Sequence, residues 1–259
     1  MARRDPVQRD ESGVRNVALV VEYDGRGFAG WQLQPGQRTV QSALEESLAV
    51  LCGHPVVVRV AGRTDSGVHA WAQRAHFFTR STLPCDRLLR GVNALAGDGV
   101  RVVKAEEVQL DWDARRNARS KLYCYRILAR AAPSALLAGR TWHVPWPLDV
   151  DLMEAELAGL LGTFDWTSYC AADGSDPNPA KELKAAYLQR EEHEVLAIRF
   201  EGSGFLKHMV RILVGTLVEV GLGKRKPGSM VEARAARDRR AAGRTAPAEG
   251  LYLELVRYC

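Results

Sequence analysis

The order of predicted strands and helices indicates an α+β protein built from two similar halves. Each half reads strand–helix–strand–strand–helix–strand, which is the ferredoxin-like order. Apolar residues alternate along the predicted strands and recur every three or four positions along the predicted helices. A content of 46% hydrophobic and 26% charged residues is typical of a globular chain. If the two halves join edge to edge, one long antiparallel sheet results, with helices on one face and a central active-site cleft on the other.

The first half is expected to cover residues 1–117 and to begin with an apolar strand at 16–23. A helix follows from about Thr39, whose side chain is a suitable N-cap. Its apolar face is formed by four residues at helical spacing, Val40, Leu44, Leu48 and Leu51. The later elements expected in this half are strands at 56–60 and 71–78, a helix at 86–95 and a strand at 100–108.

The second half, residues 118–259, repeats this order with insertions. It begins with a strand at 121–129, followed by a helix after Asp149. The apolar face of this helix is expected to contain Met153, Leu157, Leu160 and Leu161. The remaining elements are two strands at 183–190 and 195–200 joined as a hairpin, a long apolar helix at 206–220, a basic helix after Pro227 and a final strand at 251–258.

The sequence shows no sign of a membrane span or of a metal site. Its longest apolar stretch, 209–220, is shorter than the roughly 18 residues that cross a bilayer and is interrupted by Arg211 and Glu219. Residues 1–13 lack the apolar run of a signal peptide. The five cysteines form no CxxC pair and the six histidines form no HxxxH pair. We therefore expect a cytoplasmic protein with reduced thiols, without a metal and without a membrane partner.

The net charge of +5 is distributed unevenly along the chain. Residues 111–130 contain six basic and two acidic side chains, and residues 224–244 contain eight basic and two acidic ones. Such runs are often solvated surfaces without further function. They are equally typical of surfaces that contact the phosphates of a nucleic acid. Both interpretations stay open at the level of the sequence.

The strongest local signal is GRTDSGVHA, residues 62–70, between two predicted strands. Its glycines suit a tight, exposed turn that presents the carboxylate of Asp65. An aspartate held in a pocket beside a cation is a competent nucleophile, and the adjacent Arg63 is a candidate for that cation. An Asp-Ser-Gly tripeptide is more often a plain turn, however, so spacing alone does not single out Asp65.

Seven motifs follow one another from about Ala18 to Tyr258. They are EYDGRGFAGWQ (22–32), TVQSALEESL (39–48), GRTDSGVHA (62–70), GVNAL (91–95), ARSKLYCYRI (118–127), GFLKHMVRILVGTLVEVG (204–221) and TAPAEGLYL (245–253). In this order they resemble the tRNA pseudouridine synthase A family. The segment 177–186 is less typical, because it carries Lys181 and Lys184 where family members often have an arginine.

The resemblance implies an enzyme that isomerises uridine to pseudouridine at positions 38, 39 and 40 of the tRNA anticodon arm, without a cofactor or metal. It implies that Asp65 is the catalytic residue and that Tyr123 packs on the target uracil. Arg211 would pair with the Asp65 carboxylate. Arg63 would help to displace the target base, and Leu253 would line the pocket. Family members work as homodimers with the RNA lying across both subunits, and we expect the same here.

The chemistry is compatible with these residue types. Uracil must leave its ribose, rotate and rejoin through a carbon, which requires a closed pocket. Flipping the nucleotide out of its stack costs a few kcal/mol. An aromatic face such as that of Tyr123 recovers about 1–3 kcal/mol for a stacked base. Whether Asp65 attacks the sugar C1′, attacks uracil C6 or acts only as a base stays open.

Two other functions are weighed against this one. Gly25, Gly27 and Gly30 spell GxGxxG after a strand, but in a dinucleotide-binding fingerprint the third glycine opens a helix, and here the helix is expected only at Thr39. A non-catalytic RNA-binding module would carry an aromatic RNP1 strand. The nearest string, GSGFLKHMV (202–210), does not match that signature and lies at a predicted helix start.

Overall fold

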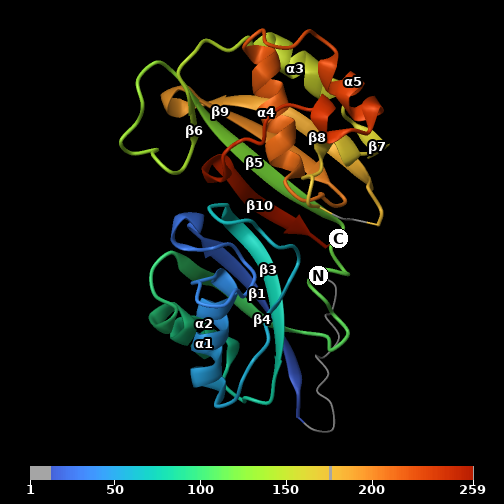
Figure 1. Cartoon of the computed structure of the whole chain (residues 1–259). Helices are drawn as coiled ribbons and strands as arrows, with labels where there is room; N and C mark the ends of the chain where they lie inside the picture. The colour runs from blue at the N-terminus through green and yellow to red at the C-terminus, as the bar shows by residue number, and fades with distance from the viewer. Residues whose placement is uncertain (1–12, 175–176, 259) are drawn as a thin grey trace, which may run out of the picture. The chain divides into compact units, whose positions relative to one another are not determined.

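The computed structural model describes residues 13–174 and 177–258. Within these residues the protein is mixed α+β, with five α-helices and ten strands that pair mostly antiparallel (Figure 1). The predicted α+β class is confirmed. The chain divides into two compact units, one formed by the described residues of Met1–Arg119 and Leu255–Cys259, the other by those of Ser120–Glu254.

The first unit has the predicted order of elements. They are β1 (Arg15–Tyr23), α1 (Val40–Cys52), β2 (Arg59–Val60), β3 (His69–Thr79), α2 (Cys85–Leu95) and β4 (Val100–Val108), with a 3-10 turn at Gly25–Gly27. Thr39 is the N-cap of α1, as predicted, because its hydroxyl accepts a hydrogen bond from the backbone N–H of Ser42. Gly53 ends this helix in the left-handed conformation, at φ 73°.

Strand β1 lies between β3 and β4 and pairs antiparallel with both. Val17 and Val21 are buried and, by the alternation of a strand, share one face of the sheet. Helices α1 and α2 cover one face of the sheet (Figure 1). Asn16 points to the opposite face, where its Nδ2 donates to the carbonyl oxygens of Gln109 (3.1 Å) and Trp112 (2.8 Å). The segment that follows β4 therefore packs on the side of the sheet away from the helices.

The predicted strand at 56–60 is shorter than expected, because only Arg59 and Val60 pair with β3. Val58 is buried, but its backbone N–H donates to Oε1 of Glu45 on α1 (2.8 Å). The Glu45 carboxylate thus accepts the backbone N–H that a carbonyl oxygen of a neighbouring strand would accept in regular pairing.

The second unit contains the other strands and three helices. They are β5 (Ser120–Ala129), β6 (Trp142–Val144), α3 (Val150–Ala158), β7 (Gly162–Asp165), β8 (Ala180–Glu191), β9 (Val195–Gly202), α4 (Met209–Gly221) and α5 (Ser229–Ala236). The last strand, β10 (Leu251–Arg257), begins in this unit and passes into the first unit after Glu254. In this unit β5, β9, β8 and β7 are neighbours in that order and pair antiparallel, while β6 runs parallel to β5. The short strands β6 and β7 were not predicted.

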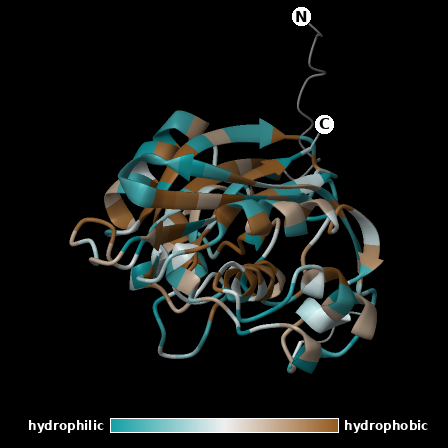
Figure 2. Ribbon diagram, turned by 90° about the horizontal axis from the view of Figure 1, so that it is seen from above, coloured by the Kyte–Doolittle hydropathy of each residue, from teal (hydrophilic) through white to brown (hydrophobic). Residues whose placement is uncertain are grey.

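The two faces of this second set of strands differ in character. Tyr125 of β5 and Ile198 of β9 are opposite each other and fully buried on the face that carries the helices. The neighbouring pair, Cys124 and Arg199, points to the other face, where Arg199 forms an ion pair with Glu254 (2.9 Å). In Figure 2 hydrophobic and hydrophilic stretches alternate along the ribbon, as expected when each strand has one packed face and one solvated face.

Two helix boundaries differ from the prediction. Helix α3 ends at Ala158, so Leu160 and Leu161 lie beyond it; Leu160 is buried and Leu161 is 44% exposed. Helix α4 begins at Met209, three residues later than predicted, because His208 adopts a left-handed conformation at φ 60°. At 13 residues α4 is apolar along most of its length, yet no helix in the described part of the chain is long and apolar enough to span a membrane.

Candidate active site

Asp65 lies in the turn between β2 and β3, where the sequence places it. Asp65 is half-buried, and Arg63, two positions earlier, is exposed. The carbonyl oxygen of Asp65 accepts a hydrogen bond from the N–H of Val68 (3.2 Å), and Gly67 has a φ of 79°. The chain therefore forms the predicted tight turn, which needs a glycine at the left-handed position.

The loop after β1 holds this turn from one side. The N–H of Trp31 donates to the carbonyl oxygen of Thr64 (3.0 Å), and the hydroxyl of Ser66 donates to the carbonyl oxygen of Phe28 (3.2 Å). Gly30, at φ 95°, approaches so closely that an added Cβ would lie 2.9 Å from the Thr64 oxygen. The residues on both sides of Asp65 are thus hydrogen-bonded to a loop that lies far away in the sequence.

The glycine string in that loop has a structural role different from nucleotide binding. A Cβ at Gly25 would lie 2.2 Å from the carbonyl oxygen of Val68, so only glycine allows the two loops to touch there. The next helix begins at Val40, ten residues after Gly30. The dinucleotide fingerprint requires a helix to open at the third glycine, and this chain has none there.

A buried polar network supports the same turn from beneath. The hydroxyls of Tyr23 and Thr64 are 2.8 Å apart. Nε2 of Gln73, a fully buried residue of β3, donates to the carbonyl oxygen of Gly62 (2.8 Å) and to the Tyr23 hydroxyl (3.3 Å). Burial raises the pKa of Tyr23 to about 12, so its hydroxyl stays protonated. Sequence reasoning missed Tyr23 and Gln73; the available signal was a polar residue at a core position of a strand.

The rim of this region carries an ion pair. Asp24 receives hydrogen bonds from the Arg26 side chain, which lower the pKa of Asp24 to about 2. His69 is buried, and its Nδ1 accepts the backbone N–H of Gly25 (3.1 Å). These contacts bind the start of β3 to the end of β1, so they add to the fixation of the turn between β2 and β3.

In the second unit Tyr123 lies near the start of β5, on the helix-covered face. It is 8% exposed, and its ring meets that of Phe205 at nearly a right angle, with ring centroids 5.0 Å apart. Such an edge-to-face contact fixes the orientation of the tyrosine ring. Leu253 of β10 is fully buried. It points to the same face as Tyr123, because its neighbour Tyr252 packs with Cys124 on the opposite one.

Arg211 occupies the first turn of α4 and is half-buried. Its Nε donates to the carbonyl oxygen of Ala246 (2.8 Å), and its own carbonyl oxygen accepts the N–H of Ala246 (3.0 Å). The second unit therefore brings Tyr123, Leu253 and Arg211 to one side of its strands. The pairing of Arg211 with Asp65 joins residues of the two units and stays a prediction.

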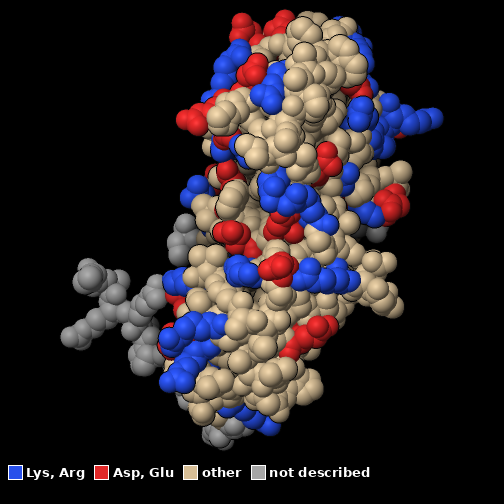
Figure 3. Space-filling model, turned by 90° about the vertical axis from the view of Figure 1, so that its left-hand side faces the viewer, with Lys and Arg blue, Asp and Glu red and all other residues tan. Residues whose placement is uncertain are grey.

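The two basic stretches of the chain differ in how far their charge is neutralised. The stretch at 224–244 contains three ion pairs of 2.9 Å or less, Arg225–Glu219, Lys226–Glu232 and Arg240–Asp238. Another of its arginines, Arg234, stacks on the ring of Phe164 at 3.5 Å. On the face drawn in Figure 3, basic and acidic side chains are interspersed. Much of this second stretch is therefore structural.

The stretch at 115–119 is different. Three arginines of this stretch are exposed, Arg115, Arg116 and Arg119. Nε of Arg116 lies 3.7 Å from Oδ2 of Asp113. Within the described ranges 13–174 and 177–258, Arg115 and Arg119 have no ion-pair partner. A positive charge that is exposed and not neutralised by the protein is the kind that binds phosphate.

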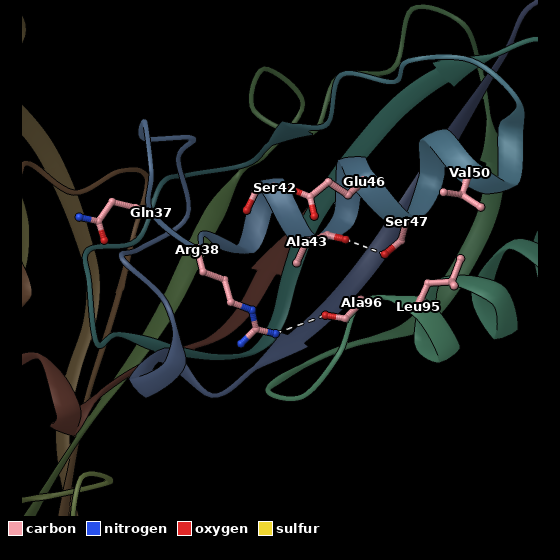
Figure 4. A pocket seen from close by; sticks show the side chains of 9 residues that line it. All are labelled: Gln37, Arg38, Ser42, Ala43, Glu46, Ser47, Val50, Leu95 and Ala96. Atoms are coloured by element: carbon pink, nitrogen blue, oxygen red, sulfur yellow. Dashed lines mark hydrogen bonds between the residues drawn. The ribbon is translucent and has the colours of Figure 1, made fainter.

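A surface pocket of about 420 Å³ lies between α1 and α2 (Figure 4), and none of its lining residues is a predicted site residue. Its largest polar side chain is Arg38, whose Nη2 donates to the carbonyl oxygens of Ala96 (3.3 Å) and Asp98 (2.7 Å). The same guanidinium lies 4.5 Å above the ring of Phe28. Arg38 is therefore engaged in holding loops together.

Comparison with known proteins supports the resemblance over nearly the whole chain. A family model described as tRNA pseudouridine synthase matches residues 19–116 and 157–259. The chain is 41% identical over 245 residues to the tRNA pseudouridine synthase A of Acetivibrio thermocellus, covering 95% of this chain and 100% of that protein. It is 42% identical over 242 residues to the protein of the same name from Myxococcus xanthus, covering 93% and 91% of the two chains. The resemblance indicated by the seven motifs is confirmed.

Proposed function

This chain belongs to the tRNA pseudouridine synthase family, whose members isomerise uridine to pseudouridine in tRNA, and we propose that its targets are uridines 38, 39 and 40 of the anticodon arm. The observation that carries the proposal is the turn at Asp65. Backbone and side-chain hydrogen bonds from three other segments fix this turn, yet Asp65 itself is only half-buried. A reactive group on a rigid, accessible turn is what a reaction on a flipped-out base requires.

We assign a role to each predicted site residue. Asp65 acts on the target nucleotide as nucleophile or base. Tyr123 stacks on the uracil, and Leu253 forms part of the apolar wall behind it. Arg211 pairs with the Asp65 carboxylate, while the exposed Arg63 takes part in displacing the base from the RNA stack. The sequence predicts a domain boundary between residues 117 and 118. Asp65 and Arg63 lie before this boundary, and Tyr123, Arg211 and Leu253 lie after it.

The reaction is balanced without a cofactor. The bond between N1 of uracil and C1′ of ribose breaks, and a bond between C5 and C1′ forms. C5 loses its hydrogen as a proton, and N1 gains a proton. No electron is transferred to or from the protein, so acid–base groups and a pocket that retains the detached uracil are sufficient.

We further propose that the protein acts in the cytoplasm as a homodimer with the tRNA lying across both subunits. The exposed arginines at 115–119 are suited to phosphate contacts on such a surface. Analytical ultracentrifugation of the protein alone and with tRNA tests this part, and a monomer that binds and modifies tRNA at full rate would contradict it.

The test of the activity uses tRNA labelled with tritium at C5 of uracil. An isomerase releases tritium to water, whereas a non-catalytic RNA-binding module does not. Substrates with cytidine at 38, 39 or 40 show which positions are modified. Asp65→Asn is nearly isosteric, so it should abolish release while leaving the melting temperature unchanged. Residual turnover within tenfold of wild type would show that Asp65 is not the catalytic group.

The Arg211 pairing needs a separate comparison. Arg211→Met keeps most of the apolar stem and removes the charge, so it should lower turnover strongly. Arg211→Lys restores a charge without the planar two-donor geometry, so it should recover part of the turnover. If the lysine variant is no better than the methionine variant, charge pairing is not the role of Arg211.

A further inference from the structure

Residues 243–246, called here the crossing segment, run over one face of α4. Three helix residues contact it. Thr216 accepts the N–H of Gly243 through its Oγ1 (2.9 Å), and Glu219 accepts the N–H of Arg244 through its Oε1 (3.0 Å). Arg211 exchanges two hydrogen bonds with Ala246. Thr216 and Glu219 are three positions apart and are neighbours on the helix surface, whereas Arg211 lies five positions before Thr216, so the crossing segment is held at two separate places on α4.

Gly215 makes this close approach feasible. A Cβ at Gly215 would lie 1.8 Å from the carbonyl oxygen of Arg244 and 3.2 Å from the backbone nitrogen of Ala246. Both atoms belong to backbone, which cannot move aside as a flexible side chain does. Any larger residue at position 215 must therefore lift the crossing segment from the helix.

The chain is also fixed immediately after the crossing segment. The hydroxyl of Tyr125, a fully buried residue of β5, donates to the carbonyl oxygen of Pro247 (2.7 Å). Burial raises the pKa of Tyr125 well above its usual value, so the hydroxyl remains a donor. A Cβ at Gly250 would lie 2.6 Å from the Tyr125 ring. The crossing segment is thus held by α4 along its length and by β5 at the residue that follows it.

We propose that the crossing segment is a positioning element that sets the direction of the Arg211 guanidinium. The Nε bond to the Ala246 carbonyl fixes the plane of this rigid group, and fixing the plane also fixes the direction of its two Nη groups. A planar fork pairs with a carboxylate only in the correct orientation. The inference rests on the proposed function, because it assigns how the Arg211 side chain is aimed for that reaction.

The proposal predicts an effect on turnover rather than on tRNA binding. Thr216→Val keeps the shape of the side chain and removes the acceptor for the Gly243 N–H. We expect kcat to fall by about ten- to hundredfold, since a displacement of about 1 Å costs roughly that much. The Kd for tRNA should stay at the wild-type value. Thr216→Ser keeps the acceptor oxygen and should stay close to wild type in both quantities.

Gly215→Ala is the second variant, and Gly221→Ala is its matched control. Both replacements are in α4, but a Cβ at Gly221 would meet side-chain atoms, Sδ and Cγ of Met153 (2.6 and 2.9 Å) and a methyl group of Leu148 (3.3 Å), and not the crossing segment. Gly215→Ala should lower kcat at least as much as Thr216→Val, and Gly221→Ala should not lower it. If Gly215→Ala does not fold, the two Thr216 variants carry the test.

A double mutant decides between positioning and general loosening of the fold. In the Arg211→Met background, Thr216→Val should cause no further loss of kcat, because its effect passes through Arg211. Unchanged kcat in Thr216→Val, or losses that multiply in the double mutant, would overturn the inference. Wild-type tritium release, and its loss in Asp65→Asn, would still stand in that case. A wild type that releases no tritium would instead refute the proposed function.

Discussion

Tyr23→Phe tests whether the buried network beneath Asp65 serves turnover as well as stability. The replacement removes one hydroxyl from a residue that is 3% exposed and changes little else. Gln73 keeps its other acceptor, the Gly62 carbonyl at 2.8 Å. Thr64 loses the partner that lies 2.8 Å from its hydroxyl. Because Thr64 directly precedes Asp65, the loss occurs next to the proposed catalytic residue.

The expected loss of stability follows from leaving the buried Thr64 hydroxyl without that partner. Such a group costs about 1–3 kcal/mol of unfolding free energy. For a chain of this size each kcal/mol lowers the melting temperature by roughly 2–4 °C. Turnover should fall further than stability, by about ten- to hundredfold, because the turn that carries Asp65 loses an anchor.

Tyr169→Phe is the matched control. Tyr169 is also fully buried, and its hydroxyl donates to the carbonyl oxygen of Met230 (2.8 Å) in the second unit. It should lower the melting temperature by a similar amount and leave kcat unchanged. Thermal melts and tritium release are measured on both variants below their melting temperatures. If Tyr23→Phe loses stability but keeps the wild-type kcat, the network does not position Asp65.

Three further predictions concern other parts of the chain. Burial lowers the pKa of His76 below 6.5, so the protein has its full stability above pH 6.5 and loses stability as the pH falls and the buried ring must take up a proton. His76→Gln should make the unfolding free energy, measured by urea titration, depend less on pH in this range. Replacing the exposed His193 should leave that pH dependence unchanged. Glu156 is buried and accepts the N–H groups of Gly228 and Met230 at the start of α5, so Glu156→Gln should cost about 1–2 kcal/mol in chemical unfolding without changing tRNA affinity. Replacing the exposed arginines at 115–119 should flatten the log–log salt dependence of tRNA binding by about 0.7–0.9 per lost contact, and an unchanged slope would make them an ordinary solvated surface.

Elements with a strong local pattern were predictable. Helix α1 has regular apolar spacing and an N-cap threonine, and it begins at Val40 as expected. Strand β4 was predicted with its observed bounds, Val100–Val108. In contrast, β6 and β7 have three and four residues, which is too few to show a period. They form because β5 and β8 offer backbone partners, and that information is not local.

The sequence by itself determined the α+β class, the order of the main elements and, through seven motifs, the family and the identity of Asp65 as the candidate catalytic residue. Only the tertiary structure revealed what holds the turn and the arginine in place. The glycine string at Gly25 and Gly30 resembled a nucleotide-binding fingerprint, yet these residues allow two loops to touch. Gly215 lies in an apolar helix, where no local pattern calls for a glycine. The reason is physical: a missing side chain acquires a meaning only from the backbone that fills its place, and in each case that backbone lies about 30 or more residues away.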